Sequence, residues 1–408
     1  MSMRDRLLTL VLYAQYTTRL SYYDDWLDAF RGDPALDVAA INIAARGSRD
    51  GLARRIKDFD LVVLLHSTNA DTLTYIEPFR DVLLARRGKL VAFVGNELNT
   101  PGSPLAARIA HLKAIRADFI ATQLLPEAGE WLYAEVESAR VISVPHALNP
   151  AVFRSTTPVT ARPIDIGTRS ARYIAYLGDD DRNRLFALFE AHRFDPALNV
   201  DISTAERLDR SGWCAFLNRC KGTIANEAGS FFLERDDRTM DAIRAYVLAK
   251  ERARGGVVIA NDSPLRRFGH RLPWFVKEPL RRLLRGGLVR HEMLINEDLP
   301  FDEIYERFYR DRPRPPFHAK AISSRHFDAI GTLTCQILLE GRYNDILAPG
   351  VHYLALKSDF SNLAEVMAEF RDPDRRQAVA NAAYELAMTA HTHRHRIAMI
   401  RDRVGVVA

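Results

Sequence analysis

Short apolar runs alternate with helix-like segments through the first part of the chain, and this alternation leaves few folds open. The runs that suit strands are Leu7–Ala14, Val38–Ala44, Leu61–His66, Leu90–Gly95, Phe119–Thr122 and Val141–Pro145. The segments that suit helices are Tyr22–Arg31, Gly51–Lys57, Leu73–Arg86, Leu105–Ile115 and Ala128–Glu137. Strands that alternate with helices in this way form parallel sheets covered on both faces. We therefore predict an α/β fold.

A second alternating series follows a proline-rich stretch that contains Pro145, Pro150, Pro158 and Pro163. Its predicted strands are Tyr173–Leu177, Val200–Ser203, Gly222–Ala225, Thr334–Leu339 and Val351–Leu356. Its predicted helices are Arg184–His192, Asp209–Arg219, Ser361–Phe370 and Pro373–Ala390. Two such series in 408 residues predict two α/β domains of ordinary size. The predicted divisions are residues 1–155 and 156–390, followed by a last helix in 391–408.

Composition narrows the class of protein. The three cysteines, Cys214, Cys220 and Cys335, form no CxxC pair, which favours a reducing compartment and argues against a disulfide framework. A formal charge of +5 is too small an excess to indicate binding to nucleic acid. The first apolar run is short and lacks a small-residue cleavage site, so we interpret it as a strand of a cytoplasmic protein, not as a signal peptide.

Polar side chains stand where several predicted strands end. His66, Glu97, Gln123 and His146 each follow an apolar run, and Glu227 follows a run in the second series. The carboxyl ends of parallel strands meet at one edge of a sheet, where ligands bind in open α/β folds. A lone histidine at a strand end is more often a structural or capping residue, and the loop that contains Glu227 can equally be a capped turn. We take Glu97, His146 and Glu227 as candidate catalytic residues and do not choose among them.

Residues 318–352 combine a helix start with a buried strand. Ser323 and Ser324 have hydroxyls suited to cap a helix, and Thr334–Leu339 fits a strand buried on both faces. Glu340 stands at the end of that strand. Because the free amides of a helix start attract phosphate, this stretch predicts an anion-binding site beside a carboxylate.

The sequence SSRHFDAIGTLTCQILLEGRYNDIL, followed by PGVHYLALKSDFSNLAEVM and RDPDRRQAVANAAYELAMTAHTHRHR, resembles the end of the nucleotide-sugar domain of GT-B glycosyltransferases. VPHALNPAVF is similar to the segment that leaves their first domain. The group-1 branch usually has a glutamate, seven residues and a second glutamate opposite the donor. Asp328 stands where the second is expected, so the resemblance implies that it accepts hydrogen bonds from the ribose hydroxyls of the donor. Lys320 stands near the first. Lys320 is therefore a departure that leaves the donor-sugar contact and the stereochemical outcome open.

The resemblance implies a GT-B-like fold with two Rossmann-like domains facing a central cleft, the second of which holds a nucleotide-sugar donor. It also implies that the terminal helix in 391–408 packs back on the first domain. The donor-binding residues that follow from the matched stretch and from the nearby helix starts are Arg182, Arg184, Lys320, Ser323, Ser324, Arg325, Asp328 and Glu340. Arg182 and Arg184 are candidate diphosphate partners, although arginines of no special role are common on surfaces. The resemblance also places the loop that contains Glu227 in the donor cleft.

Three successive aspartates, Asp179, Asp180 and Asp181, allow two interpretations. They can form a metal-binding DxD motif, or they can complement the dipole at the start of the following helix. We favour the second, because GT-B transferases generally work without a metal. The histidines of HTHRH, near the C-terminus, lack accompanying ligands. We therefore expect no metal and no cofactor besides the nucleotide sugar, and activity that survives EDTA.

An insertion near residues 256–317 does not fit the alternation. Within it, Ser263–His291 carries eight lysines and arginines and one acid, interleaved with leucine, phenylalanine and tryptophan. This composition suits docking on an anionic membrane surface through residues 264–290, or a helical hairpin packed on the core with snorkelling arginines. Pro264, Pro273 and Pro279 predict two short helical pieces in this stretch.

Together these features predict a glycosyltransferase that moves a sugar from a nucleotide-sugar donor to a glycan or lipid-linked acceptor, such as a precursor of a cell-envelope polysaccharide. The predicted protein is cytoplasmic, with peripheral attachment to the membrane as an open question. Two alternatives remain: an epimerase or hydrolase of nucleotide sugars on the same fold, and a sugar-nucleotide-binding protein without catalysis.

Overall fold

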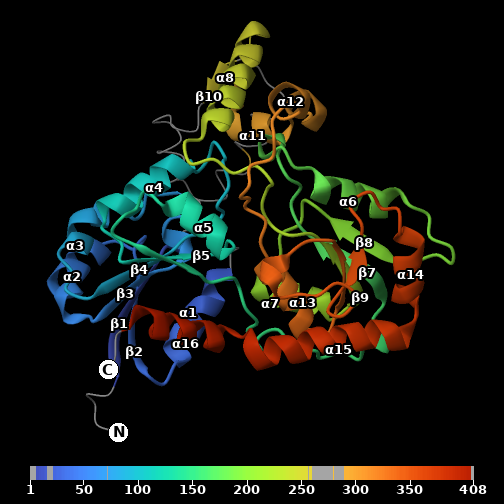
Figure 1. The fold of residues 1–408 in the computed structure, drawn as a ribbon, viewed down its shortest axis with the longest axis horizontal. Helices are drawn as coiled ribbons and strands as arrows, with labels where there is room; N and C mark the ends of the chain where they lie inside the picture. The colour runs from blue at the N-terminus through green and yellow to red at the C-terminus, as the bar shows by residue number, and fades with distance from the viewer. Residues whose placement is uncertain are drawn as a thin grey trace.

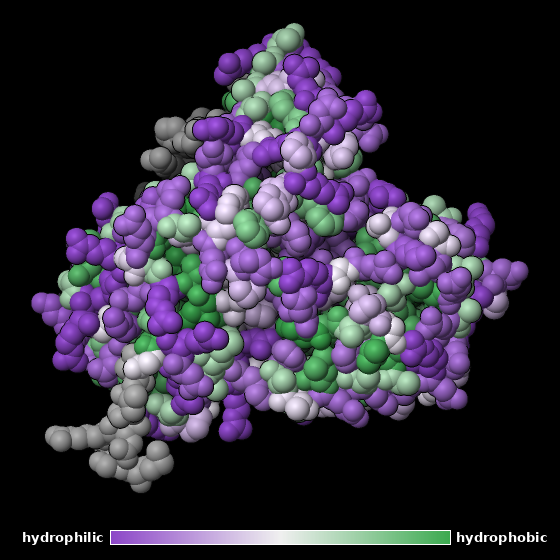
Figure 2. Space-filling view, in the orientation of Figure 1, coloured by the Kyte–Doolittle hydropathy of each residue, from purple (hydrophilic) through white to green (hydrophobic). Residues whose placement is uncertain are grey.

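Two α/β units lie side by side in the computed structural model, with a smaller group of helices projecting above the junction between them (Figure 1). The structure describes residues 6–15, 22–70, 72–255, 257–259, 279 and 289–405. In the same orientation, hydrophilic side chains cover much of the surface, and apolar patches show on both units (Figure 2).

The first unit contains a six-stranded parallel sheet in the order β2-β1-β3-β4-β5-β6. Its strands are β1 (Leu7–Tyr13), β2 (Leu36–Asn42), β3 (Leu61–Leu64), β4 (Lys89–Phe93), β5 (Phe119–Thr122) and β6 (Arg140–Ser143). All four residues of β3 are buried, and apolar clusters pack on both faces of the sheet. The structure confirms the six predicted strands. Each apolar run forms a buried strand because it has apolar side chains for both covered faces of the sheet.

The helices of the first unit are α1 (Tyr22–Gly32), α2 (Ser48–Arg55), α3 (Arg80–Leu84), α4 (Leu105–Ala114) and α5 (Pro126–Tyr133). The single helix predicted over Leu73–Arg86 is wrong in its first half. A 3₁₀ turn over Glu77–Phe79 precedes the short α3. Pro78 explains the difference, because proline lacks a backbone donor and disfavours helical geometry in the residue before it.

The second unit contains a five-stranded parallel sheet in the order β13-β12-β9-β7-β8. Its strands are β7 (Ile164–Arg169), β8 (Val200–Ser203), β9 (Cys220–Ala225), β12 (Cys335–Leu339) and β13 (Leu354–Leu356). The strand predicted at Tyr173–Leu177 is wrong, since Ala175–Leu177 is a 3₁₀ turn and β7 precedes it. Ala175 and Tyr176 of that turn pack in one apolar cluster with side chains of the projecting helices.

The helices of the second unit are α6 (Asp181–Ala191), α7 (Arg210–Leu217), α13 (Ser324–Gly331), α14 (Leu363–Arg371) and α15 (Pro373–Ala390). Helix α15 has the predicted bounds. It begins there because the Asp372 side chain accepts hydrogen bonds from the amides of Asp374 and Arg375 at the first turn. The helix predicted from Ser361 begins two residues later, after Asn362.

The projection is formed by α8 (Arg238–Ala253), β10 (Val257–Ile259), β11 (Val289–His291), α11 (Glu292–Glu297) and α12 (Phe301–Phe308). β10 and β11 form a small parallel pair. An apolar cluster that includes Ile243, Val247 and Ile304 packs these helices on the 3₁₀ turn at Ala175. The short helices predicted within Ser263–His291 lie outside the described residues apart from Pro279 and 289–291.

Helix α16 (His393–Val404) runs back from the second unit to the first (Figure 1). Its Ile397 and Ile400 lie in the same apolar cluster as Trp26 and Phe30 of α1. Two parallel α/β units with a terminal helix that returns to the first confirm the predicted GT-B-like fold class. The domain divisions near residues 155 and 390 stay a prediction.

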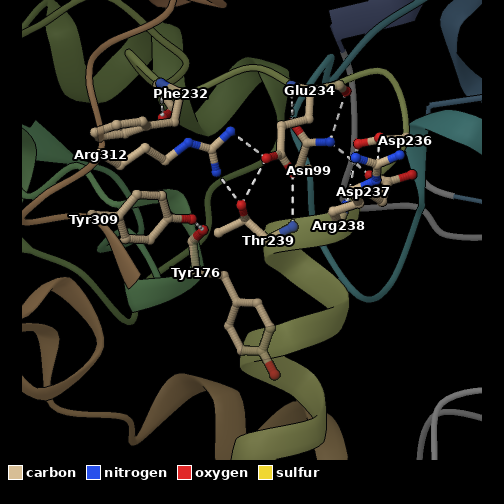
Figure 3. Close-up of polar contacts among 11 residues, drawn as sticks. Asn99, Tyr176, Phe232, Glu234, Asp236, Asp237, Arg238, Thr239, Tyr309 and Arg312 are labelled. Carbon is tan, nitrogen blue, oxygen red and sulfur yellow. Dashed lines mark hydrogen bonds and ion pairs between the residues drawn. The ribbon is translucent and has the colours of Figure 1, made fainter. Parts of the chain in front are cut away.

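A polar network joins the first unit to the segments that flank the projection (Figure 3). The Asn99 side chain donates to the Glu234 carbonyl at 2.9 Å and accepts from the Glu234 amide at 2.9 Å. Asp237 accepts from Asn99 at 2.6 Å and from the Ala106 amide at 2.8 Å, so this residue, which directly precedes α8, also caps the start of α4. Arg312 pairs with Glu234 in the same network. These contacts attach the loop before α4 to the segments on either side of the projection.

Candidate functional site

The order of the second sheet marks where a ligand is expected. From β7 the chain goes to β8 on one side and then returns to β9 on the other side. In open α/β sheets ligands bind at such a switch point, outside the carboxyl ends of the two strands. Tyr173 follows β7, and Asn226 follows β9. We call Tyr173, Arg182, Trp213, Asn226 and Arg325 the switch-point cluster.

Two arginines of this cluster are held by aromatic rings. The Arg182 guanidinium carbon lies 3.9 Å from the ring centroid of Tyr173, and its Nε donates to Asn226 Oδ1 at 3.1 Å. The Arg325 guanidinium carbon lies 5.7 Å from the ring centroid of Trp213, and the group donates to the Arg169 carbonyl. These contacts orient the two cations without cancelling their charges.

Neither Arg182 nor Arg325 forms an ion pair with a carboxylate within the part of the chain that the structure describes. Other arginines of the second unit do: Arg169 pairs with Asp201 and Glu206, and Arg172 pairs with Glu190. Arg325 is exposed, yet the surrounding protein, and then the charge of Arg182, lower the pKa of Arg325 to about 10. Two like charges held close together favour an anionic ligand.

Helix α13 begins within this cluster, since Arg325 lies in its first turn. The Ser323 amide donates to His326 Nδ1 at 3.0 Å, which with the Ser323 hydroxyl completes a reciprocal cap at the helix start. Burial lowers the pKa of His326 to about 3, so the ring is neutral at physiological pH. The predicted N-cap serine is confirmed. The first backbone amides of a helix have no partner within the helix and are suited to an anion.

Asp328 is buried on α13 and accepts a hydrogen bond from Trp213 Nε1 at 3.0 Å. Burial, followed by the nearby charge of Asp25, raises the pKa of Asp328 well above its usual range. The contact shows that Asp328 holds the Trp213 ring in place. Its predicted contact with the nucleotide ribose stays a prediction.

Lys320 does not offer an available charge. Its ammonium group is 2.6 Å from Asp179 and 3.6 Å from Asp181, and the side chains of Lys320 and Asp179 are almost wholly buried. Asp180 is the N-cap residue of α6 and Asp181 lies in its first turn, as the helix-start interpretation of the aspartates predicted. The role of Lys320 in donor binding stays a prediction, and the ion pair does not favour it.

Arg184 and Glu340 lie apart from the contacts of the cluster. Arg184 donates to the Ser358 carbonyl at 3.2 Å and its guanidinium carbon lies 5.1 Å from the ring centroid of Phe360, beyond β13. Glu340 is exposed directly after β12. The structure brings Arg182, Arg325 and the start of α13 together, but it does not join Arg184 or Glu340 to them by a contact.

Glu97, at the edge of the first sheet, is fully engaged by its neighbours. Its carboxylate accepts from Thr122 Oγ1 at 2.5 Å, from Tyr133 Oη at 2.7 Å and from the Gln123 amide at 3.2 Å. Burial raises the pKa of Glu97. The arrangement is that of a buried structural network, so the catalytic role of Glu97 stays a prediction.

His146 and Glu227 are buried on opposite units. His146 Nε2 lies 2.7 Å from the Gln123 side-chain amide, and burial, followed by the charge of Arg396, lowers the pKa of His146 to about 4. Glu227 accepts from the Tyr343 amide at 2.6 Å, and burial raises the pKa of Glu227. The catalytic roles of these two residues stay predictions.

A line of contacts links these candidates across the two units. The Gln123 backbone amide contacts Glu97, its side chain contacts His146, and its carbonyl accepts from Asn344 Nδ2 at 2.9 Å. Tyr343, the neighbour of Asn344, contacts Glu227. An exposed pair between Arg342 and Glu127, at 2.7 Å, crosses beside them.

Sequence reasoning missed Tyr173 and Trp213. The first was assigned to the predicted strand Tyr173–Leu177, and the second to the predicted helix Asp209–Arg219 without any role in the site. No local pattern marks an aromatic ring that will stack on a distant arginine, because 112 residues separate Trp213 from Arg325. Among the described residues, no group of three histidine, cysteine, aspartate or glutamate side chains is arranged to hold a metal. No helix in the described ranges is both long and apolar enough to cross a membrane.

Among known protein families, one model matches the last quarter of the chain. The family model described as "Glycosyl transferase-like" matches residues 305–402, which confirms the resemblance seen in the sequence. No curated protein matches the chain.

Solved structures align over nearly the whole chain at low identity. The Anabaena protein HepE, in complex with UDP-glucose, is 10% identical with a TM-score of 0.47, covering 98% of this chain and 100% of that one. Sucrose-phosphate synthase from Thermosynechococcus elongatus is 10% identical with a TM-score of 0.44, covering 99% and 100%. A trehalose-phosphate synthase from Burkholderia xenovorans is 11% identical with a TM-score of 0.38, covering 98% and 100%.

Proposed function

We propose that this chain, a GT-B-type glycosyltransferase, takes its sugar from a nucleotide-sugar donor whose diphosphate binds at the switch-point cluster. One observation carries the proposal: Arg182 and Arg325 stand at the switch point of the second sheet, oriented by aromatic rings and unpaired with carboxylates in the described chain. A nucleoside diphosphate offers the negative charge and the acceptor oxygens that suit two such cations.

The chemistry of sugar transfer explains why the site needs positive charge. When the bond between the sugar and the diphosphate breaks, the leaving diphosphate gains negative charge. Guanidinium groups donate paired hydrogen bonds to phosphate oxygens, and the amides at the start of α13 add further donors. Groups that are already oriented stabilise this charge without reorganising during the reaction.

The acceptor is proposed to approach from the first sheet. The first sheet has a switch point of its own between β1 and β3, where the Ala14 amide donates to Ser67 Oγ at 3.0 Å. An acceptor hydroxyl needs a base or the leaving phosphate itself to take its proton. Glu97, His146 and Glu227 remain the candidate bases, and Glu97 is the least suited because its neighbours already occupy its oxygens.

A lipid-linked or glycan acceptor, used at the cytoplasmic face of a membrane, is the acceptor class that we propose. The argument rests on the basic and apolar composition of residues 264–290, where each lysine or arginine near an anionic surface contributes about 1 kcal/mol. Sedimentation with liposomes that contain anionic lipid, at low and high salt, tests it. Absence of sedimentation at low salt would end the membrane proposal and leave the transferase proposal standing.

A thermal-shift screen across UDP, GDP, ADP and CDP sugars tests the proposed donor, because selective binding stabilises the folded state. Turnover is then measured with and without candidate acceptors. An epimerase acts without acceptor, a transferase hydrolyses its donor only slowly without one, and a sugar-nucleotide-binding protein shows no turnover. Absence of a shift with every nucleotide would contradict the proposal.

A further inference from the structure

Asn226 directly follows β9 in the switch-point cluster, and only 3% of its surface is exposed. Its Oδ1 accepts from Arg182 Nε at 3.1 Å. A guanidinium group can only donate, so this contact identifies the oxygen of the side-chain amide. The nitrogen, Nδ2, must therefore be the atom on the other side of the amide.

Nδ2 of Asn226 is buried and has no hydrogen-bond partner within the described residues. A buried donor without a partner costs free energy, so an unpaired one at a ligand-binding edge indicates a missing acceptor. The switch point of the sheet independently puts a ligand at the same place.

The groups around Asn226 are also donors. Arg182 contacts it directly, and Arg325 lies close enough to Arg182 to affect its own pKa. His326 accepts through Nδ1, so its neutral ring carries the hydrogen on Nε2, which lies near the Asn226 carbonyl without good hydrogen-bond geometry. An environment made of donors selects a ligand that offers acceptor oxygens and negative charge.

We propose that Asn226 is a donor-binding residue whose Nδ2 gives a hydrogen bond to a diphosphate oxygen of the nucleotide sugar, while its Oδ1 holds Arg182. This proposal rests on the proposed function, and it adds a contact that neither the sequence motif nor the family match assigns. The same amide thus performs two tasks: one half orients a cation, and the other half binds the anion.

The substitution Asn226→Asp separates the two tasks. Aspartate keeps an oxygen for Arg182, and its charge strengthens that contact, so the fold should stay intact. It also replaces the Nδ2 donor with a negative oxygen that repels phosphate. We expect the affinity for the nucleoside diphosphate that wild type binds to fall about tenfold or more by calorimetry, without loss of Tm. The matching monophosphate should lose less, because the contact is to the diphosphate.

Asn381→Asp on the exposed face of α15 is the matched control, since it makes the same chemical change away from the cluster. Unchanged diphosphate affinity in Asn226→Asp would overturn the proposal and leave Asn226 as a positioning residue for Arg182. An equal loss for monophosphate and diphosphate would also contradict a contact to the diphosphate.

A double-mutant cycle keeps the proposal testable if Asn226→Asp fails to fold. Asn226→Ala is measured alone and together with Arg182→Ala. If Asn226 acts only through Arg182, the alanine at 226 has no further effect once Arg182 is removed, and the proposal fails. A remaining loss of about threefold or more supports direct binding. If wild type binds none of UDP, GDP, ADP and CDP, the proposed function itself is wrong.

Discussion

The two sheet edges differ in whether their polar side chains have hydrogen-bond or ion-pair partners within the protein. At the edge of the first sheet, Glu97 is surrounded by donors that occupy its oxygens. At the edge of the second, Arg182 and Arg325 have no carboxylate partner in the described chain, and Asn226 Nδ2 has no acceptor there. The first edge therefore contributes to the stability of the fold, whereas the second keeps hydrogen-bonding capacity for a ligand.

Removing a polar group from the edge of the first sheet, where the hydrogen-bonding groups already have partners, should give the largest change in stability. Glu97→Ala leaves Thr122, Tyr133 and the Gln123 amide without their buried acceptor. Each unsatisfied buried group costs about 1–3 kcal/mol, so we expect the free energy of unfolding to fall by about 3 kcal/mol or more. Denaturant unfolding measures it.

Glu97→Gln is the matched control for that change, because it keeps one acceptor oxygen and should lose less. Nucleotide affinity of the folded fraction should stay unchanged in both variants. A stable Glu97→Ala protein with lost turnover would instead assign Glu97 to catalysis and break the contrast between the two edges.

Removing a cation from the unsatisfied edge should affect binding and spare the fold. Arg325→Ala removes a charge-assisted contact to the diphosphate, so nucleotide affinity should fall by about 1–3 kcal/mol in calorimetry. Its Tm should change little, because Arg325 is exposed and pairs with no carboxylate in the described residues.

Arg172→Ala is the control for the Arg325 variant. Arg172 belongs to the same unit but its charge is neutralised by Glu190 at 2.7 Å. Its removal should leave affinity unchanged. Equal effects of the two substitutions would indicate a general electrostatic field and not a site.

Acid should lower the free energy of unfolding through two buried histidines, one in the first unit and one in helix α16. Burial lowers the pKa of His146 to about 4 and that of His393 to about 3, whereas histidines of the unfolded chain titrate near their ordinary pKa of 6.5. A lowered folded-state pKa means that stability is complete above pH 6.5 and is lost as the pH falls from there towards the folded values. At pH 5 the loss should be on the order of 1–2 kcal/mol for each histidine.

Unfolding measured from pH 8 to pH 5 tests this, with His393→Leu as the informative variant. Neither ring nitrogen of His393 forms a hydrogen bond of good geometry in the described chain, so leucine should cost little at pH 8 and should flatten the pH dependence. His192→Leu, at an exposed position, should keep the wild-type slope. An unchanged slope in His393→Leu would show that other groups cause the acid sensitivity.

Much of the fold follows from the sequence, and the reasons are local. Runs such as LVVL in β3 have enough apolar side chains for two covered faces, and Asp372 marks the start of α15 by its side chain alone. The strand predicted at Tyr173–Leu177 failed because its apolar residues face the projection, a neighbour that no local pattern reveals.

The candidate site was predictable only in part. Arg182, Arg325 and Ser323 stand at helix starts, where the sequence gives a reason to expect an anion. That Lys320 is neutralised depends on an ion pair with Asp179, 141 residues away in the chain, and the roles of Tyr173 and Trp213 depend on similar long-range contacts. Such contacts form only when residues that are far apart in the sequence come together in the folded chain, so no local sequence pattern predicts them.

The smallest effect is expected at Asp328, which belongs to the second unit but resembles the satisfied groups of the first. Its carboxyl has a raised pKa, and it accepts from Trp213. A raised folded-state pKa gives stability that is complete below the unfolded value of 3.8 and is lost as the pH rises through the folded value. Asn has the same shape and carries no charge, so Asp328→Asn should change the free energy of unfolding at pH 5 by less than about 0.5 kcal/mol and should remove that loss at higher pH.

Nucleotide affinity should stay within about twofold if Asp328 serves only to hold Trp213. A fall of tenfold or more with the fold intact would instead make Asp328 a ribose ligand, as its place in the sequence motif implies, and would move it to the ligand-binding side of the comparison.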